Sequence, residues 1–271
     1  MKVFISADME GICGIVSGHQ TDANDKEYPR AQRVLTAEVN AVIVGALRGG
    51  ATEIVVNDSH GSMRNIILEE LNPAARLVSG SPKPLSMMQG IDSTYQVALF
   101  VGYHAQAGTE SGILDHTFSG RVHQVAINDI PLGETGLNAS LAGYFGVPVS
   151  LVTGDKAVTE EAQRLLGPIE VVAVKEACGR NAAQCLPLKE AYDLVGAAAQ
   201  RALERPGKPF VLPSPYKLAV DFARSSYADI AELIPGSRRQ GARRVEFHHE
   251  DYLTVYKTWR AMVSLALLEE Q

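Results

Sequence analysis

The chain has 271 residues, 46% of them hydrophobic and 21% charged, a composition typical of a globular protein with a large buried core. Its formal charge of −6, from 31 acidic and 25 basic residues, argues against a nucleic-acid partner, because such proteins normally carry a basic surface. No apolar run approaches the roughly 20 residues of a membrane span, and the N-terminus has no signal-peptide pattern, so we expect a cytoplasmic protein without a membrane partner.

Buried strands and helices alternate in the first two thirds of the chain. Residues 3–7 form an uncharged strand, helical spacing of apolar side chains predicts a helix over 35–47, and residues 54–56 form a second strand. The following pattern predicts strands at 97–101, 122–127, 149–152 and 171–174, with helices at 134–145 and 158–166. This alternation predicts an α/β fold with a mainly parallel sheet flanked by helices.

The last third has a different organisation. A helix over 189–204 leads into the proline-rich segment 205–215, which is followed by strands at 217–222 and 244–247 and helices at 228–234 and 251–268. We therefore predict an α/β domain over residues 1–185 and a smaller C-terminal α+β domain over residues 186–271, with the exact boundary open.

Polar side chains follow the first three predicted strands. Asp8 and Glu10 come after the first strand, His60 after the second and His104 after the third. Each of them alone could be a turn cap or an ordinary surface residue. The carboxyl ends of parallel strands share one edge of the sheet, where ligands bind in open α/β folds, so we expect these side chains to lie together. Glu134, at the start of a predicted helix, is either a further member or a residue favoured by the helix dipole.

This set combines imidazole and carboxylate without thiolate, which suits a divalent metal ion. Five ligands exceed the three that the protein supplies to a catalytic zinc, but they fit two metals about 3.5–4 Å apart with one bridging carboxylate. Two divalent ions against three carboxylates leave one positive charge for a bridging hydroxide, which is a nucleophile at neutral pH. The sequence therefore predicts a hydrolase with a binuclear metal site.

Other residues with chemical potential allow two interpretations. His116 lies in a polar loop and is either a general acid or base or an exposed histidine. Asp155 precedes a helix, so an N-cap is favoured over a sixth ligand. Lys83 either contacts substrate or is solvated. We expect His123 to be structural, and His248 and His249 to face solvent.

The cysteines and one group of arginines also need an interpretation. Cys13, Cys178 and Cys185 are too few for a disulfide framework, and free buried thiols are favoured over a bond between the last two. The basic group is expected to be a solvated loop, with an interface patch as the alternative; it comprises Arg238, Arg239, Arg243 and Arg244.

Four segments around the candidate ligands have a recognisable pattern. They are Ser6-Ala7-Asp8-Met9-Glu10-Gly11, Val56-Asn57-Asp58-Ser59-His60, Gly102-Tyr103-His104-Ala105 and Gly133-Glu134-Thr135-Gly136-Leu137-Asn138-Ala139. These segments resemble the signature segments of the DppA-type zinc D-aminopeptidases, a family of binuclear metallopeptidases. The similarity extends over nearly the whole chain and includes the Lys83-Pro84 loop.

The resemblance implies two Zn²⁺ ions per chain and a role for each candidate. Asp8 would bridge both ions, Glu10 and His60 would complete one site, and His104 and Glu134 the other. His116 would be the catalytic residue. The implied activity is release of N-terminal D-amino acids, such as D-Ala, from short peptides by a metal-bound hydroxide, in a homo-oligomer built as a decamer of two stacked pentameric rings.

One residue departs from the family pattern, and two other functions stay open. Cys13 stands where serine is expected, which places a thiol near the predicted metals. A binuclear phosphoesterase would use the same ligand types but needs further phosphate-binding groups, and only Asn57, Asn128 and Arg121 lie near the motifs. A non-enzymatic, metal-stabilised binding or ring protein would have a closed metal site saturated by protein ligands.

Overall fold

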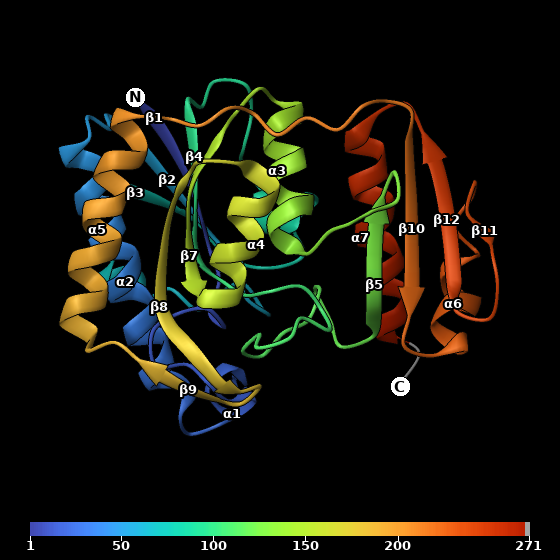
Figure 1. Ribbon diagram of the computed structural model, residues 1–271, viewed down its shortest axis with the longest axis horizontal. Helices are drawn as coiled ribbons and strands as arrows, with labels where there is room; N and C mark the ends of the chain where they lie inside the picture. Colours follow the sequence, from blue (N-terminus) through green and yellow to red (C-terminus); the bar gives the residue numbers. More distant parts are fainter. Residues whose placement is uncertain (269–271) are drawn as a thin grey trace.

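The computed structural model describes residues 1–268, which form two β-sheets of different size (Figure 1). The larger sheet has seven strands in the order β3-β2-β1-β4-β7-β8-β9, and all but β9 run parallel. Its strands are β1 (Lys2–Ala7), β2 (Glu53–Asp58), β3 (Ala75–Val78), β4 (Val97–Tyr103), β7 (Val149–Asp155), β8 (Glu170–Gly179) and β9 (Ala182–Cys185). The first strand therefore lies between β2 and β4.

Helices cover both faces of this sheet, as its uncharged central strands require. On one face lie α2 (Tyr28–Arg48) and α5 (Leu188–Glu204), which pack against each other, and on the other lie α3 (Glu134–Tyr144) and α4 (Lys156–Leu166) (Figure 1). The alternation along β1 matches these two layers, because Val3 and Ile5 join the core under α2 and α5 whereas Phe4 joins the opposite core. Short helices α1 (Gly18–Thr21), η1 (Leu68–Glu70) and η2 (Ser86–Met88) lie in the connections.

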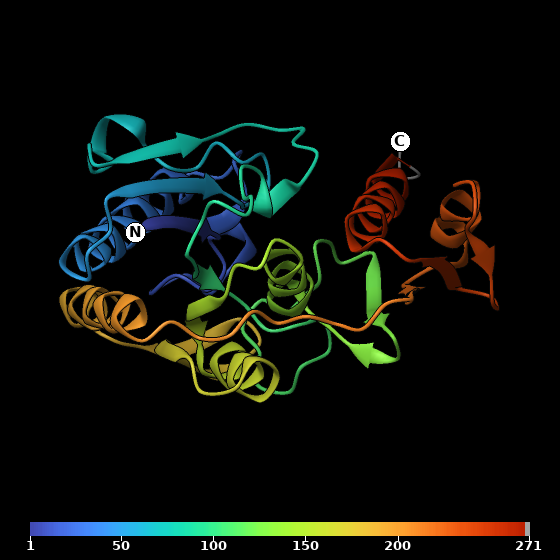
Figure 2. The same ribbon diagram turned by 90° about the horizontal axis from the view of Figure 1, so that it is seen from above.

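The smaller sheet has five antiparallel strands in the order β11-β12-β10-β5-β6. They are β5 (Val122–Ile127), β6 (Ile130–Pro131), β10 (Tyr216–Phe222), β11 (Arg238–Arg239) and β12 (Arg244–His249), and they pack with α6 (Ser225–Ala231) and α7 (Tyr252–Leu268). Figure 2 shows this smaller part beside the larger one.

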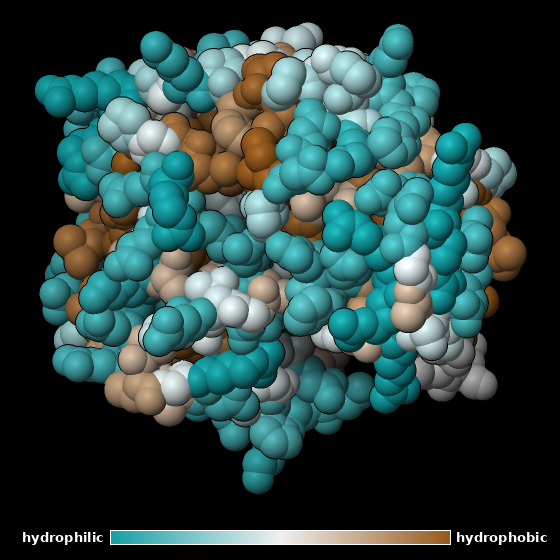
Figure 3. Space-filling model, turned by 45° about the vertical axis from the view of Figure 1, so that its right-hand side comes forward, coloured by the Kyte–Doolittle hydropathy of each residue, from teal (hydrophilic) through white to brown (hydrophobic). Residues whose placement is uncertain are grey.

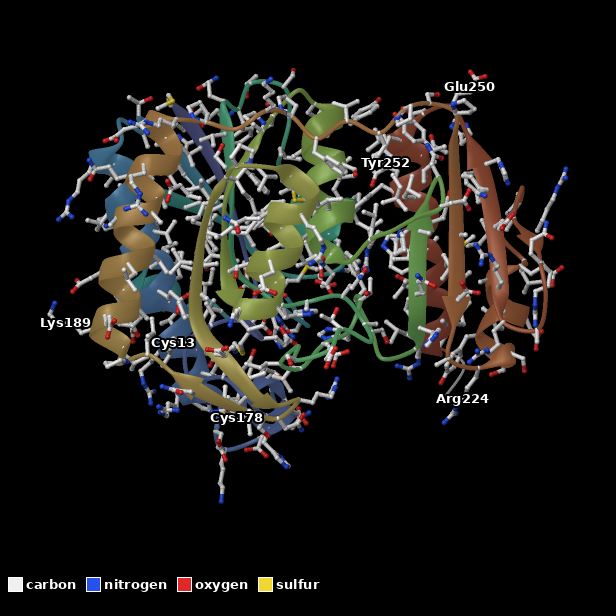
Figure 4. All side chains as sticks on the ribbon, in the orientation of Figure 1. Cys13, Cys178, Lys189, Arg224, Glu250 and Tyr252 are labelled. Atoms are coloured by element: carbon white, nitrogen blue, oxygen red, sulfur yellow. The ribbon has the colours of Figure 1, made fainter. Side chains whose placement is uncertain are left out.

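One hydrophobic core connects the two parts. It runs from Phe100 on β4 through Leu137 on α3 to Trp259 on α7. The hydroxyl of Tyr252, at the start of α7, donates a hydrogen bond to the carbonyl of Leu137 at 3.0 Å, and its side chain lies between the two parts in Figure 4. Helix α3 is thus packed on the larger sheet and against α7 at the same time.

The α/β class with a mainly parallel sheet and a smaller second part is confirmed, but the sheets do not divide the chain at residue 185. Residues 122–127, which we placed with the parallel strands, pair with β10 in the second sheet, because a long loop carries them across the molecule. Helix α5, which we placed in the C-terminal part, packs on α2.

One smaller expectation also changes. The arginine group is not a loop, because Arg239 lies in β11 and Arg244 in β12, and both form ion pairs with carboxylates. Among the described residues, no helix is long and apolar enough to cross a membrane.

Candidate active site

The strand order brings the predicted ligands together. Asp8 and Glu10 follow β1 at the centre, while His60 and His104 follow β2 and β4 on its two sides. Glu134 is the first residue of α3, which packs beside β4. The structure therefore places all five predicted ligands at the carboxyl edge of one sheet.

Two glycines allow the loop after β1 to lie directly against the end of β4. A Cβ atom on Gly11 would lie 1.9 Å from the carbonyl oxygen of Tyr103, and one on Gly102 would lie 2.3 Å from that of Asp8. Gly102 also has a φ of +69°, in the left-handed region that side chains disfavour. This close backbone approach sets Asp8 beside His104.

The carboxylate of Asp8 faces both histidines. Its Oδ1 lies 3.5 Å from His60 Nδ1 and its Oδ2 lies 3.6 Å from His104 Nε2. Glu10 Oε2 lies 2.8 Å from the same nitrogen of His60, and Glu134 Oε1 lies 3.3 Å from that of His104. The donors thus form two groups that share Asp8, which is the arrangement that two bridged metal ions require.

Backbone carbonyls orient the histidines. His60 Nε2 lies 2.9 Å from the carbonyl of Thr21, and His104 Nδ1 lies 3.0 Å from that of Ala105. A ring nitrogen that donates to a carbonyl leaves the other nitrogen free to bind a metal, as in most histidine metal ligands. That other nitrogen of His104, Nε2, is buried and has no hydrogen-bond partner among the described residues. The donor set and this orphaned nitrogen fit metal binding.

The charges at this edge also favour cations. Burial and the neighbouring Glu10 raise the pKa of Asp8 to about 7. Burial disfavours the charged form of His104, but the carboxylates of Glu134 and Asp8 outweigh it and raise its pKa to about 10. Burial likewise opposes ionisation of Glu10, yet the charge on His60 holds the pKa of Glu10 well below its usual range. Three carboxylates buried this close together are stable in their charged form only if positive charges lie beside them.

His116 lies against this group. Its ring stacks on that of His104, with centroids 4.0 Å apart, and its Nε2 lies 3.8 Å from Glu134 Oε1. Its Nδ1 lies 2.8 Å from the carbonyl of Leu114, which points Nε2 into the site. Burial and the charge of His104 lower the pKa of His116. Donor atoms of His104, His116 and Glu134 lie within 4.8 Å of one another, so the geometry allows His116 to act as a further ligand or as a base.

The carboxyl edge that carries the five candidate ligands, called here the metal-binding edge as a candidate site, lines a cavity of about 450 Å³. The size is that of a small-molecule site. Its walls include four of the five candidate ligands and His116, and helix α7 supplies part of the remaining wall. The lining residues are Asp8, Glu10, Ser59, His60, Gly61, Met63, Ser86, Met87, His116, Phe118, Glu134, Arg260, Val263 and Leu267.

A family model described as D-aminopeptidase matches residues 1–261. The chain belongs to the D-aminopeptidase family. It is 39% identical over 270 residues to a D-aminopeptidase of Bacillus subtilis (strain 168), with 98% of each sequence covered. Its fold matches the Zn-dependent D-aminopeptidase DppA from Bacillus subtilis, described as a self-compartmentalizing protease, with a TM-score of 0.96 and 38% identity over 98% of each chain. The resemblance seen in the signature segments is thereby confirmed.

One positioning residue of this D-aminopeptidase family member was not expected from its sequence. Lys175, on β8, is buried, and its Nζ donates to the carbonyls of Glu10, Ile12 and Ile15, with the bond to Ile12 at 3.0 Å. It therefore holds the backbone of the loop that carries Glu10. The sequence does contain a signal for this role, because a lysine within an otherwise apolar strand needs a buried partner.

The other candidates lie outside the ligand group. Asp155 caps α4, with its Oδ1 accepting from the amide of Val158 at 2.8 Å, so the predicted N-cap is confirmed. Lys83 is neither solvated nor on the cavity wall, because its ammonium group donates to Asn57 Oδ1 at 2.7 Å and to the carbonyl of Asp58 at 2.6 Å. His123, expected to be structural, is exposed on β5.

His248 and His249 are exposed, as predicted. All three cysteines are free thiols, although Cys178 is exposed rather than buried. Figure 4 shows Cys178 at the outer end of β8 and Cys13 inside the larger part. The thiol of Cys13 donates to the carbonyl of Leu186 at 3.3 Å, and burial raises its pKa to about 12, so it is a buried, protonated group.

Proposed function

We propose that this chain is a zinc aminopeptidase that releases N-terminal D-amino acids, such as D-Ala, from short peptides. The observation that carries the proposal is the pair of donor groups sharing Asp8 at the end of a cavity, in a member of the D-aminopeptidase family. A purely structural metal site would be closed and saturated by protein ligands, whereas this one opens into the cavity.

Two zinc ions would fit the two donor groups. Asp8, Glu10 and His60 would hold one ion, and Asp8, His104 and Glu134 the other. When bound, such a pair supplies Lewis-acid polarisation of the scissile carbonyl and lowers the pKa of water to about 7.

His116 is suited to proton transfer at the same place. Its Nδ1 proton is held by the carbonyl of Leu114, so Nε2 is the acceptor that faces the site. Because burial lowers its pKa, the ring is neutral near pH 7 and can take a proton from the attacking water. It can then return that proton to the leaving amine as the amide bond breaks.

The phosphoesterase alternative has less support than the peptidase. Neither Asn57 nor Asn128 lines the cavity. The amide of Asn57 donates to Ser59 and to a carbonyl, and that of Asn128 donates to the carbonyl of Pro213. These groups are engaged in the fold and are unavailable to clamp a phosphate.

The test is hydrolysis of D-Ala-D-Ala, L-Ala-L-Ala and p-nitrophenyl phosphate by the zinc-loaded protein. We expect turnover of the D-dipeptide, lost on chelation and restored by zinc, with far slower turnover of the other two compounds. Phosphatase activity without peptidase activity, or a protein that binds less than one divalent ion per chain, would overturn the proposal.

Two variants separate ligands from the proton-transfer residue. His104→Ala should lower zinc content, whereas His116→Ala should keep zinc and lower kcat by about 10²- to 10⁴-fold. His123→Ala, which changes an exposed histidine on β5, is the matched control and should alter neither quantity. Loss of zinc from the His116 variant would make that residue a ligand instead.

We also propose a homo-oligomer, by extension from the relative described as self-compartmentalizing. The face shown in Figure 3 carries an apolar patch near its upper edge, and exposed apolar patches are typical of protein interfaces. A decamer, which the family resemblance implies, would have ten times the mass of one chain in light scattering. A monomeric mass would refute assembly. A cytoplasmic location stays a prediction from the sequence.

A further inference from the structure

Helix α7 contributes an arginine to the cavity that the candidate ligands line. Arg260 lines the same cavity as Asp8 and Glu134, although it belongs to the smaller part of the molecule. Its side chain is partly buried, so little water can solvate the guanidinium. Burial lowers the pKa of Arg260 from its ordinary value, an effect that Tyr256 and Glu134 oppose. An arginine nevertheless stays charged at neutral pH, so the cavity contains a fixed cation.

Among residues 1–268, no carboxylate forms an ion pair with this cation. Over the same range, Arg260 forms no ion pair or hydrogen bond, and its guanidinium carbon lies 4.6 Å from the centre of the Phe118 ring. Other arginines of the same part are paired, Arg239 with Asp229 and Arg244 with Asp221. A buried charge is costly unless an opposite charge meets it, so Arg260 is suited to an anion that arrives from outside.

Phe118 contacts both this arginine and the candidate ligand Glu134. Its amide donates to Glu134 Oε1 at 2.6 Å, and its ring packs edge-on against Trp259 at 5.7 Å. Its φ of +60° is unusual for an aromatic residue, which indicates that surrounding contacts hold the backbone in place. One phenylalanine therefore contacts a candidate ligand through its backbone amide and the guanidinium through its ring.

A short peptide fits a cavity of this size. Two extended residues span at most about 7 Å, and a cavity of about 450 Å³ leaves little room for a long chain. With its first amide bond at the candidate ligands, a dipeptide or tripeptide would place its C-terminal carboxylate inside the same cavity, which Arg260 also lines. In a peptide of small apolar residues such as alanine, the C-terminal carboxylate is the only anionic group. Carboxylates also match the planar fork of a guanidinium, which can bind both oxygens at once.

We propose that Arg260 binds the C-terminal carboxylate of the substrate, so that the enzyme selects short peptides with a free C-terminus. This inference rests on the proposed peptidase function. Phe118 acts as the platform that holds the guanidinium in place by a cation–π contact. Arg260 is thus a specificity-determining residue, and the larger part of the molecule supplies the chemistry.

The test compares two substrates that differ only at the C-terminus, D-Ala-D-Ala and D-Ala-D-alaninamide. The zinc-loaded wild-type enzyme should prefer the free acid on the order of 10- to 100-fold in kcat/KM, mainly through KM, as expected for one charge-assisted pair. Arg260→Met should bring this ratio close to one, and Arg260→Lys should leave an intermediate ratio. The ratio does not depend on the fraction of folded or zinc-loaded enzyme.

The controls separate the possible failures. Arg244→Met removes a paired arginine in β12 of the same part and should keep the wild-type ratio. An Arg260→Met enzyme that loses activity equally on both substrates would overturn the carboxylate subsite. A wild-type enzyme that hydrolyses neither substrate would instead refute the peptidase function. Equal wild-type activity on the acid and the amide would leave the peptidase standing and overturn the subsite alone.

Discussion

Replacing Lys175 with methionine tests how the structure positions Glu10. The ammonium group of Lys175 donates to three carbonyls of the loop that follows β1, including that of Glu10 itself. Methionine fills a similar volume but donates no hydrogen bond. We expect the loop to lose its fixed shape while both hydrophobic cores stay intact.

The magnitude follows from two opposing contributions. Burial lowers the pKa of Lys175 from 10.5 to about 8, so keeping the charge costs about 3 kcal/mol at 1.36 kcal/mol per unit. Each hydrogen bond from a charged group contributes about 1.5–3 kcal/mol, and three of them exceed that cost. Lys175→Met should therefore lower the free energy of unfolding by about 2–5 kcal/mol.

Zinc affinity provides the more specific measurement. Residues that orient metal ligands typically change metal affinity about 10- to 100-fold when they are removed, and we expect a loss in this range. Competition with a chromophoric chelator measures the affinity, and urea denaturation of the zinc-free protein measures stability. Lys156→Met, which removes an exposed ammonium group paired with Glu176, should change neither. Wild-type zinc affinity in the Lys175 variant would refute the positioning role.

Three further predictions concern charge, backbone and metal. Burial raises the pKa of Glu38 to about 7, so the folded state keeps a proton that the unfolded state loses, and stability falls as pH rises from about 4.5 to 7. Glu38→Gln should abolish this pH dependence, which amounts to up to about 3 kcal/mol in the free energy of unfolding measured by denaturation at each pH. The same pH dependence in the variant and the wild type would contradict the prediction. Gly102→Ala should abolish zinc binding, because the added Cβ atom would clash with the carbonyl oxygen of Asp8. Gly14 also has a positive φ, +79°, but no atom lies within 4 Å of its Cβ position, so Gly14→Ala should keep zinc and lower the free energy of unfolding by only about 1 kcal/mol. Equal zinc contents in the two variants would contradict the close approach of the loop after β1 to the end of β4. Chelation should lower the melting temperature, and zinc at 100 times its Kd should restore about 2.7 kcal/mol, so a melting temperature insensitive to zinc would argue against the site.

The position of the candidate metal ligands could be predicted because it follows from the short segment in which each of them lies. A polar side chain directly after a buried parallel strand lies at the carboxyl edge, whatever the order of the strands. Asp8, His60 and His104 each satisfied this rule within their own segment. The strand order, by contrast, comes from long-range packing. The short β3, with no fully buried residue, carried too weak a pattern to be recognised, so its place at the sheet edge was not expected.

The contribution of α7 to the cavity could not be predicted from the sequence. Arg260 lies more than one hundred residues after the last candidate ligand, on a helix whose apolar pattern shows only that one face is buried. Whether a charged residue of such a helix faces solvent or a cavity depends on how the helix docks. The sheet to which β5 belongs was mispredicted for the same reason. Its buried residues suit a strand of either sheet, and its partner β10 lies about ninety residues later in the chain.

The hydrophobic core shared by the two parts holds Glu134 and Arg260 at a constant separation. Helix α3 begins with Glu134 at the metal-binding edge, and α7 packs against it while carrying Arg260. Two independent domains with a mobile interface would allow the separation between these groups to vary. Here Leu137 and Trp259 belong to one close-packed core, so that separation is fixed. A fixed distance between the cleaved bond and the group that binds the C-terminus makes peptide length a criterion for turnover, which a peptidase with an open cleft would not have.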